Sequence, residues 1–112
     1  MEYIEEKNRV YLIDDEKKRV ALIDFPEVES GVVDINHTEV DKTLAGQGIA
    51  GILTQKAVEI LRQDKRKAIL TCSYAIRWFS KHPECEDVLL SPEKERQKAE
   101  MVTFPACGIR RK

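Results

Sequence analysis

Residues 44–51 read Leu-Ala-Gly-Gln-Gly-Ile-Ala-Gly and join a segment with strand periodicity to a segment with helical periodicity. Before them, residues 32–40 alternate apolar and polar side chains, which predicts one half-buried strand. After them, apolar residues recur every three or four positions, which predicts a helix over residues 48–63. A phosphate group fits such a turn, because the first N–H groups of a helix have no internal acceptor and glycine lets an anion approach them.

The glycine pattern alone leaves two interpretations open. Glycines before a helix also serve simply as turn formers, so a short glycine motif is a weak indicator of a phosphate site. The chain has no P-loop, since no GxxxxGK is followed by Ser or Thr. The rest of the chain must therefore decide between a phosphate site and a plain turn.

Four short blocks occur in a characteristic order: His-Thr-Glu-Val at 37–40, Gly-Gln-Gly-Ile-Ala at 46–50, Cys-Ser-Tyr at 72–74 and His-Pro-Glu at 82–84. Residues 45–50 resemble the acetyl-CoA pyrophosphate loop of the GNAT N-acetyltransferase superfamily, which is written Gln/Arg-x-x-Gly-x-Gly/Ala. The four blocks together resemble the short GNAT-like proteins that carry a cysteine where the fifth core strand ends. The resemblance covers roughly residues 8–90.

The resemblance implies acetyl-CoA as co-substrate and no metal. The pyrophosphate is expected on the turn from Gly46 to Ala50, against the N–H groups at the start of the helix. The pantetheine arm is expected in a wedge between two strands that splay apart where they end, at Val40 and Cys72. The implied cofactor-binding residues are Glu39, Val40, Gly46, Gln47, Gly48, Ile49 and Ala50.

Two positions depart from the superfamily pattern. The first position of the loop motif is Ala45, so one usual phosphate contact is missing, and Lys42 is either a substitute charge or a solvated loop lysine. In ordinary GNAT enzymes a tyrosine protonates the departing CoA thiolate, and here the matching residue is Phe79, which has no proton to give. The same register places Cys72 where those enzymes have asparagine.

Cys72 is the candidate catalytic residue. It is expected to end a buried strand just before a helix, where the helix dipole favours a thiolate that could attack the acetyl thioester. The alternative is an inert packing cysteine, as most buried cysteines are. His37 is expected on the face of Val33 and Ile35 and therefore partly buried, although His37 or Glu39 could instead serve as a base for the amine.

The remaining pattern predicts an α/β fold of reduced GNAT type, in which an antiparallel meander is followed by a helical crossover to a parallel strand. Residues 1–90 are expected to form one domain, and 91–112 a polar helix and tail, with 91–101 helical but solvated on all sides. Ser73 is the expected N-cap of the second helix and 27–31 a turn region. Further strands are expected over 9–13, 19–25 and 67–72.

The composition favours a small cytoplasmic domain. Its 112 residues carry a net charge of −1, which argues against a nucleic-acid partner, and no apolar run is long enough to span a membrane. Three cysteines without a metal-binding spacing predict neither a disulfide framework nor a zinc site. The protein is expected to be a monomer or a weak dimer.

The connection over residues 14–18 is too short for the two helices that build the acceptor pocket of larger GNAT enzymes. The acceptor side is therefore expected to be open, which suits a protein or peptide amine. The predicted function is an acetyl-CoA-dependent N-acetyltransferase of unknown amine acceptor, and the alternative is a non-enzymatic acyl-CoA-binding or interaction module.

Overall fold

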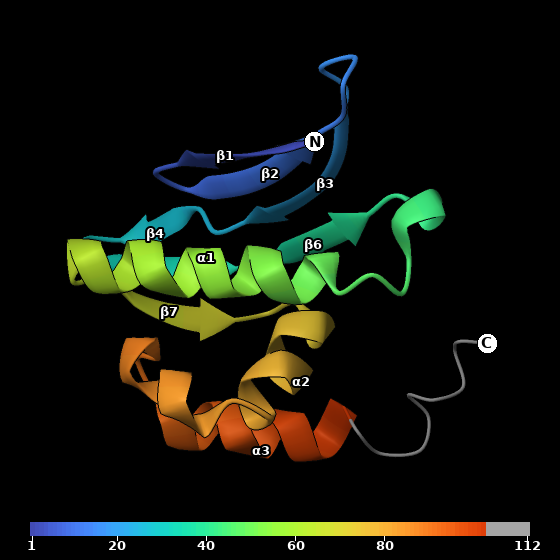
Figure 1. Cartoon of the computed structure of the whole chain (residues 1–112). Coiled ribbons are helices and arrows are strands. Elements are labelled where there is room, and N and C mark those ends of the chain that lie inside the picture. The colour runs from blue at the N-terminus through green and yellow to red at the C-terminus, as the bar shows by residue number, and fades with distance from the viewer. Residues whose placement is uncertain (103–112) are drawn as a thin grey trace.

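The computed structural model describes residues 1–102 and has a mixed α/β architecture (Figure 1). A four-stranded antiparallel sheet has the order β1-β2-β3-β6, and a three-stranded sheet has the order β4-β5-β7. The first sheet contains β1 (Glu2–Glu6), β2 (Arg9–Ile13), β3 (Arg19–Asp24) and β6 (His37–Val40). The second contains β4 (Glu27–Glu29), β5 (Val32–Ile35) and β7 (Lys67–Leu70).

The helices follow the order that the sequence predicts. The helix α1 (Ile49–Asp64) crosses from β6 to β7 and is preceded by the short 3-10 helix η1 (Lys42–Leu44). After β7 come α2 (Ser73–Ser80), the 3-10 helix η2 (Pro83–Val88) and α3 (Pro92–Val102). The β5–β7 pairing is parallel and the β2–β3–β6 pairing is antiparallel, which confirms the predicted meander and crossover.

The predicted single strand over residues 32–40 is in fact two strands that belong to different sheets. Its first half, β5, pairs with β7, and its second half, β6, pairs with β3. The change occurs at Asn36, where the alternation shifts phase: Ile35 is fully buried, while Thr38 rather than His37 lies in register with the buried Ile23. Such a one-residue irregularity turns every later side chain to the other face of the sheet.

Other predicted boundaries also differ from the structure. The edge strand β1 was not predicted, because its sequence is rich in glutamate, and the expected turn at 27–31 contains the short strand β4. The N-cap of α2 is Cys72 rather than Ser73, since the Cys72 backbone is extended and its carbonyl accepts the first helical hydrogen bond from Ile76 (3.0 Å). The η2 turn was likewise not predicted.

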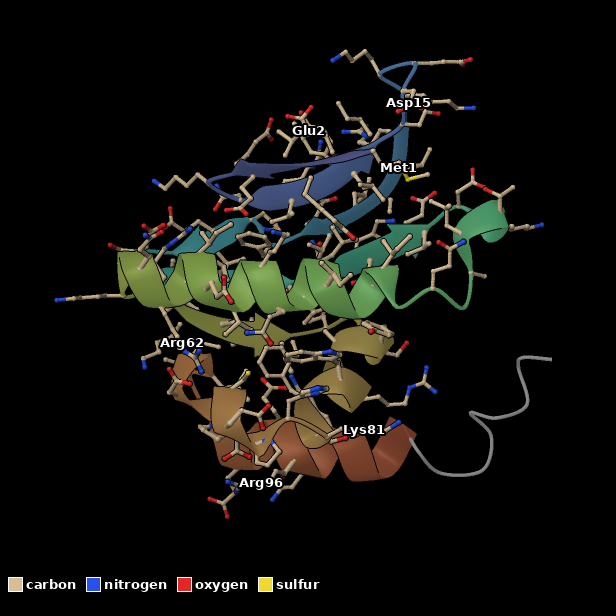
Figure 2. The ribbon with its side chains drawn as sticks, viewed as in Figure 1. Met1, Glu2, Asp15, Arg62, Lys81 and Arg96 are labelled. Carbon is tan, nitrogen blue, oxygen red and sulfur yellow. The ribbon has the colours of Figure 1, made fainter. Side chains whose placement is uncertain are left out.

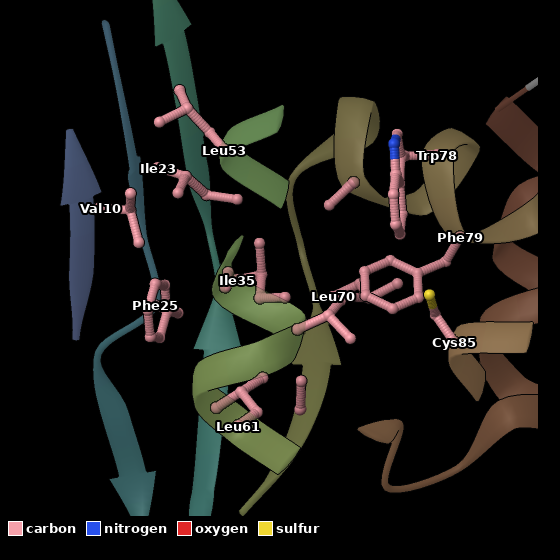
Figure 3. Close-up of a cluster of buried hydrophobic side chains, with 14 of the residues drawn as sticks. Val10, Ile23, Phe25, Ile35, Leu53, Leu61, Leu70, Trp78, Phe79 and Cys85 are labelled. Atoms are coloured by element: carbon pink, nitrogen blue, oxygen red, sulfur yellow. The ribbon is translucent and has the colours of Figure 1, made fainter. Parts of the chain in front are cut away.

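The hydrophobic core lies between the sheets and the helices (Figure 3). Leu53 and Leu61 project from α1 toward Val10, Ile23 and other strand residues, and all four side chains are fully buried. On the other side of β7, Leu70 faces Phe79 of α2, which lies next to Cys85. This core fixes both elements that lead into the glycine loop, β6 and α1, and both that flank Cys72, β7 and α2.

The η2 turn is held against α1 by Arg62 (Figure 2). The Arg62 guanidinium donates two hydrogen bonds of 2.8 Å to the Asp87 carboxylate and one of 3.0 Å to the Glu84 carbonyl. These bonds lower the pKa of Asp87. Buried Cys85 lies in the same turn, and burial raises the pKa of its thiol. Cys85 is therefore a packing residue.

The helix α3 covers the free edge of β7, and it is not solvated on all sides as predicted. The buried Glu95 carboxylate accepts a hydrogen bond from the Leu70 N–H (3.3 Å), and the Lys98 ammonium donates to the Leu70 carbonyl (2.9 Å). Among the described residues, the second Glu95 oxygen has no hydrogen-bond partner of good geometry, but it lies 3.2 Å from the Lys98 ammonium, which balances its charge. Two side chains thus bond to the main chain at the end of β7, and the Leu90 N–H bonds to the Ala68 carbonyl (2.9 Å) farther back in the strand. The rest of the predicted tail, residues 103–112, lies outside the described residues.

We expect Glu95→Ala to lower the free energy of unfolding by about 2–4 kcal/mol, because it leaves the Leu70 N–H without its acceptor and the Lys98 ammonium without its counter-charge. Glu95→Gln keeps an acceptor for Leu70 and should cost about half as much. Urea unfolding measures both changes. Glu93→Gln, an exposed position on the same helix, is the matched control and should stay within about 0.5 kcal/mol of the unmodified chain. Equal effects at Glu93 and Glu95 would contradict this account of the β7 edge.

Candidate functional site

The loop between β6 and α1 is exposed but well ordered by its own contacts. Asp41 caps η1, accepting hydrogen bonds from the N–H (2.9 Å) and hydroxyl (2.8 Å) of Thr43, and these bonds lower the pKa of Asp41. Leu44 is buried and anchors the loop to the core. Gly46 and Gly48 then adopt φ angles of +84° and +76°, in the left-handed region that favours glycine. The glycine pattern is therefore required by the backbone of the turn.

The turn exposes the N-terminus of α1. The first hydrogen bond of the helix runs from the Ile52 N–H to the Gly48 carbonyl (3.1 Å), so the N–H groups of Ile49, Ala50 and Gly51 precede the internal ladder. The Gln47 N–H instead points to the Leu44 carbonyl at 3.4 Å. Three consecutive main-chain donors at the positive end of a 16-residue helix form a suitable site for an anion.

Residues 46–51 also have the spacing GxGxxG, which is found in dinucleotide-binding turns. In that motif the glycines follow a parallel strand directly and open the helix of a βαβ unit. Here β6 is antiparallel to its neighbour β3, and η1 separates it from the glycines. The context therefore does not fit a dinucleotide fold.

A wedge opens between β6 and β7 beyond Asn36. The Ile35 carbonyl is the last shared point of the two segments, accepting hydrogen bonds from the N–H groups of Thr71 (3.2 Å) and Cys72 (3.1 Å). From there β6 continues in the first sheet toward Val40, while the chain after β7 turns into α2. Because β6 and β7 belong to different sheets, their facing backbone edges are not paired with each other.

Cys72 lies at the mouth of this wedge and is partly exposed. Its sulfur donates a hydrogen bond of 3.5 Å to the Thr38 hydroxyl, which projects from β6 on the opposite side. As the N-cap of α2, Cys72 also stands at the positive end of a helix dipole. The Cys72 thiol is therefore partly accessible, whereas Cys85 is buried.

Two side chains of α2 approach the first turn of α1. A Cβ atom on Gly51 would lie 3.5 Å from the Trp78 Nε1 and 3.7 Å from the Tyr74 hydroxyl. Burial raises the pKa of Tyr74, and the nearby Cys72 raises it further, so this hydroxyl keeps its proton at neutral pH. Phe79, which stands at the position where the family pattern has the usual tyrosine acid, is buried in the core.

Thr38 and Tyr74 are thus site residues that the sequence did not single out, although both lie within the blocks that carry the resemblance. Nothing in the sequence around them distinguishes these two residues, because they become neighbours of the site only when the fold brings β6, α1 and α2 together. Glu39 and Val40 lie on β6 as expected. Lys42 is exposed on η1.

His37 is exposed, and the prediction that it is partly buried beside Val33 and Ile35 is wrong. The phase shift at Asn36 turns His37 away from the buried face of Ile35 to the exposed face, where its Nε2 lies 3.1 Å from the Glu39 Oε1. In the register of the sheet it lies opposite Asp24. The two side chains form an exposed polar pair on the face of β6 opposite Thr38.

Within residues 1–102, no three His, Cys, Asp or Glu side chains are grouped as metal ligands would be. None of the helices in the described part of the chain combines the length and the apolar character needed to cross a bilayer.

Comparisons with known proteins agree with this geometry. Residues 9–88 match a family model described as GCN5-related N-acetyl-transferase. An NMR structure of a GCN5-like protein from Staphylococcus aureus, described as a candidate N-acetyltransferase, is 33% identical, covers 80% of this chain and 88% of that chain, and has a TM-score of 0.67. Human protein NATD1 is 36% identical over 52 residues, which is 46% of each chain.

The match thus spans about half the length of that curated relative. The crystal structure of Rv2747 from Mycobacterium tuberculosis, solved in complex with CoA and NLQ, shares the fold at 15% identity, with a TM-score of 0.55 over 68% of this chain and 47% of that one. On the extent of the family match, supported by the shared fold, this chain belongs to the GCN5-related N-acetyltransferase family.

Proposed function

We propose that this protein is an acetyl-CoA-dependent N-acetyltransferase, with the pyrophosphate on the turn from Gly46 to Ala50 and the acetyl thioester beside Cys72. The observation that carries this proposal is the placement of an exposed helix N-terminus and an accessible thiol at one wedge between two sheets. These two features come from segments far apart in the chain, which supports a common site.

Several features support CoA as the ligand. The three free N–H groups at the start of α1 suit a pyrophosphate. The unpaired edge of β6, which includes Glu39 and Val40, suits the amide groups of a pantetheine arm, because extended chains bind such edges through main-chain hydrogen bonds. A protein of the same fold, Rv2747, has been solved with CoA bound.

The proposed chemistry proceeds in two steps. The Cys72 thiolate attacks the acetyl carbonyl carbon, a C–S bond to Cys72 forms, and the C–S bond to CoA breaks, so that CoA leaves as a thiolate and takes a proton from solvent. The amine then attacks the acetyl-cysteine thioester, loses a proton to water, which could pass it on to the His37–Glu39 pair on the other face of β6, and releases the Cys72 thiolate.

We propose a protein or peptide amine as acceptor. The face of the first sheet opposite α1 leaves Ile4, Tyr11 and Leu22 partly exposed, and a hollow of about 490 Å³ on that face extends from Glu6 to Asn36, where the wedge begins. A wide, open surface suits a protein or peptide acceptor better than a small amine, which is held in an enclosed pocket. We further propose that the reaction takes place in the cytoplasm, where thiols stay reduced, on a monomer or weak dimer.

A non-enzymatic acyl-CoA-binding module is the second candidate, and the buried Phe79 in place of the usual acid favours it. One assay separates the two functions. We expect the full chain to bind CoA in calorimetry at micromolar to millimolar concentration and to release free thiol from acetyl-CoA faster with peptide amines than without. Binding with no release above spontaneous hydrolysis would identify the module, and no binding at millimolar CoA would reject both.

A further inference from the structure

We propose that Thr38 is a positioning residue for Cys72: its hydroxyl holds the sulfur at the mouth of the wedge and donates a hydrogen bond to it once the thiol has lost its proton. This inference rests on the proposed function, since it names the group that prepares the proposed nucleophile.

The geometry that supports this role comes from the break at Asn36. In an uninterrupted strand, His37 would lie on the same face as Ile35, and Thr38 would point to the opposite face. The phase shift instead puts Thr38 in register with Ile23, on the side of the sheet that faces α1, and its Oγ1 lies 3.5 Å from the Cys72 sulfur. The contact joins β6 of the first sheet to Cys72, which follows β7 of the second sheet and lies 34 residues further along the chain.

The helix that follows Cys72 does not supply the same contact. Cys72 is the N-cap of α2, yet its side chain makes no capping hydrogen bond to the N–H groups of the first turn. In the part of the chain that the structure describes, Thr38 is the hydrogen-bond partner found for this sulfur. The α2 dipole can favour a thiolate, but a directed donor has to come from across the wedge.

The chemistry of the two groups allows the hydrogen bond to reverse. In the structure the thiol donates and the Thr38 oxygen accepts. When the S–H proton leaves to solvent, the hydroxyl can rotate and donate its own proton to the sulfur anion, because a hydroxyl is both donor and acceptor. A hydrogen bond to a charged group is stronger than one to a neutral group, so Thr38 favours the thiolate.

The other titratable and charged groups around Cys72 act differently. Tyr74 of α2 interacts electrostatically with Cys72, and Arg77 lies within electrostatic reach of Tyr74. On the β5 side, the Asp34 carboxylate accepts a hydrogen bond from the Thr71 hydroxyl (2.8 Å). His37 and Glu39 of β6 bond to each other on the opposite face. Thr38 is therefore the group to vary.

The test measures the alkylation rate of Cys72 by iodoacetamide against pH in the full chain without CoA, with peptide mass spectrometry to separate Cys72 from Cys85 and Cys107. We expect Thr38→Val, which keeps the shape and removes the hydroxyl, to move the midpoint of the rate profile upward by about one to two pH units. Thr38→Ser retains a hydroxyl and should restore most of the shift. Thr71→Val removes a neighbouring hydroxyl that contacts Asp34 instead and should leave the midpoint unchanged.

An unchanged midpoint in folded Thr38→Val overturns the proposal, even if that variant is less stable. A merely structural role for Thr38 would lower stability without moving the pH profile. If Thr38→Val does not fold, Thr38→Ala carries the same comparison. The experiment is independent of acyl transfer. A shifted midpoint in a protein whose Cys72 takes no acetyl group would support the role of Thr38 while rejecting the proposed function.

Discussion

Incubation with acetyl-CoA should add one acetyl group to the protein, and Cys72→Ala should abolish this adduct. Cys72 is the partly exposed thiol at the wedge, whereas Cys85 is fully enclosed by η2 and the core. Only a thiolate attacks a thioester efficiently, and alanine offers no nucleophile. Amine-dependent release of CoA should fall at least about 100-fold in the same variant, since both steps pass through this sulfur.

Intact-protein mass spectrometry measures the adduct, and peptide mapping locates it. Cys85→Ala is the matched control and should retain the adduct. Calorimetry should show that Cys72→Ala still binds CoA, which separates loss of chemistry from loss of the ligand. An adduct that persists in Cys72→Ala, or that maps to Cys85 or Cys107, would remove Cys72 from the mechanism.

Gly48→Glu should weaken CoA binding by about 100-fold, which corresponds to about 2.7 kcal/mol. The φ angle of +76° at Gly48 disfavours any residue with a Cβ atom by about 1–2 kcal/mol, although no atom lies within 4 Å of the place a Cβ would take. The carboxylate adds repulsion, because it stands beside the N–H groups that we expect to hold the pyrophosphate. At about 4 Å this repulsion is worth about 1–4 kcal/mol, depending on exposure to solvent.

Isothermal calorimetry with CoA measures this effect, and two further variants divide it into its causes. Gly48→Gln has the size of glutamate without its charge and should lose much less affinity. Gly31→Ala introduces a side chain at a similar φ of +78°, far along the chain from the loop, and should lower stability without changing affinity. Equal affinity of the glutamate and glutamine variants would show that the pyrophosphate does not lie on this turn.

The sequence predicted the elements whose signal is local. The apolar runs in residues 9–13 and 19–25, the helical period after Gly48 and the glycines themselves were sufficient, because each is set by neighbours a few positions away. The blocks that carry the family resemblance then predicted the fold. The positive φ angles of Gly46 and Gly48 explain why glycine is required there.

The sequence could not predict features that depend on distant partners. The sequence of residues 32–40 predicts one continuous strand, yet the strand is divided at Asn36. The first half pairs with β7 and the second half pairs with β3. A polar helix gave no sign that Glu95 and Lys98 would bond to Leu70, because the open edge of β7 exists only in the folded sheet.

By itself, the sequence determined the glycine turn and the amphipathic helix after it, both from residues adjacent in the chain, while the family resemblance made Cys72 the candidate thiol. Only the tertiary structure decided which side chains meet at the wedge: it turned His37 out to solvent and placed Thr38 3.5 Å from the Cys72 sulfur. The physical reason is that strand phase follows from pairing between sheets, and one residue of irregularity at Asn36 reverses every side chain after it.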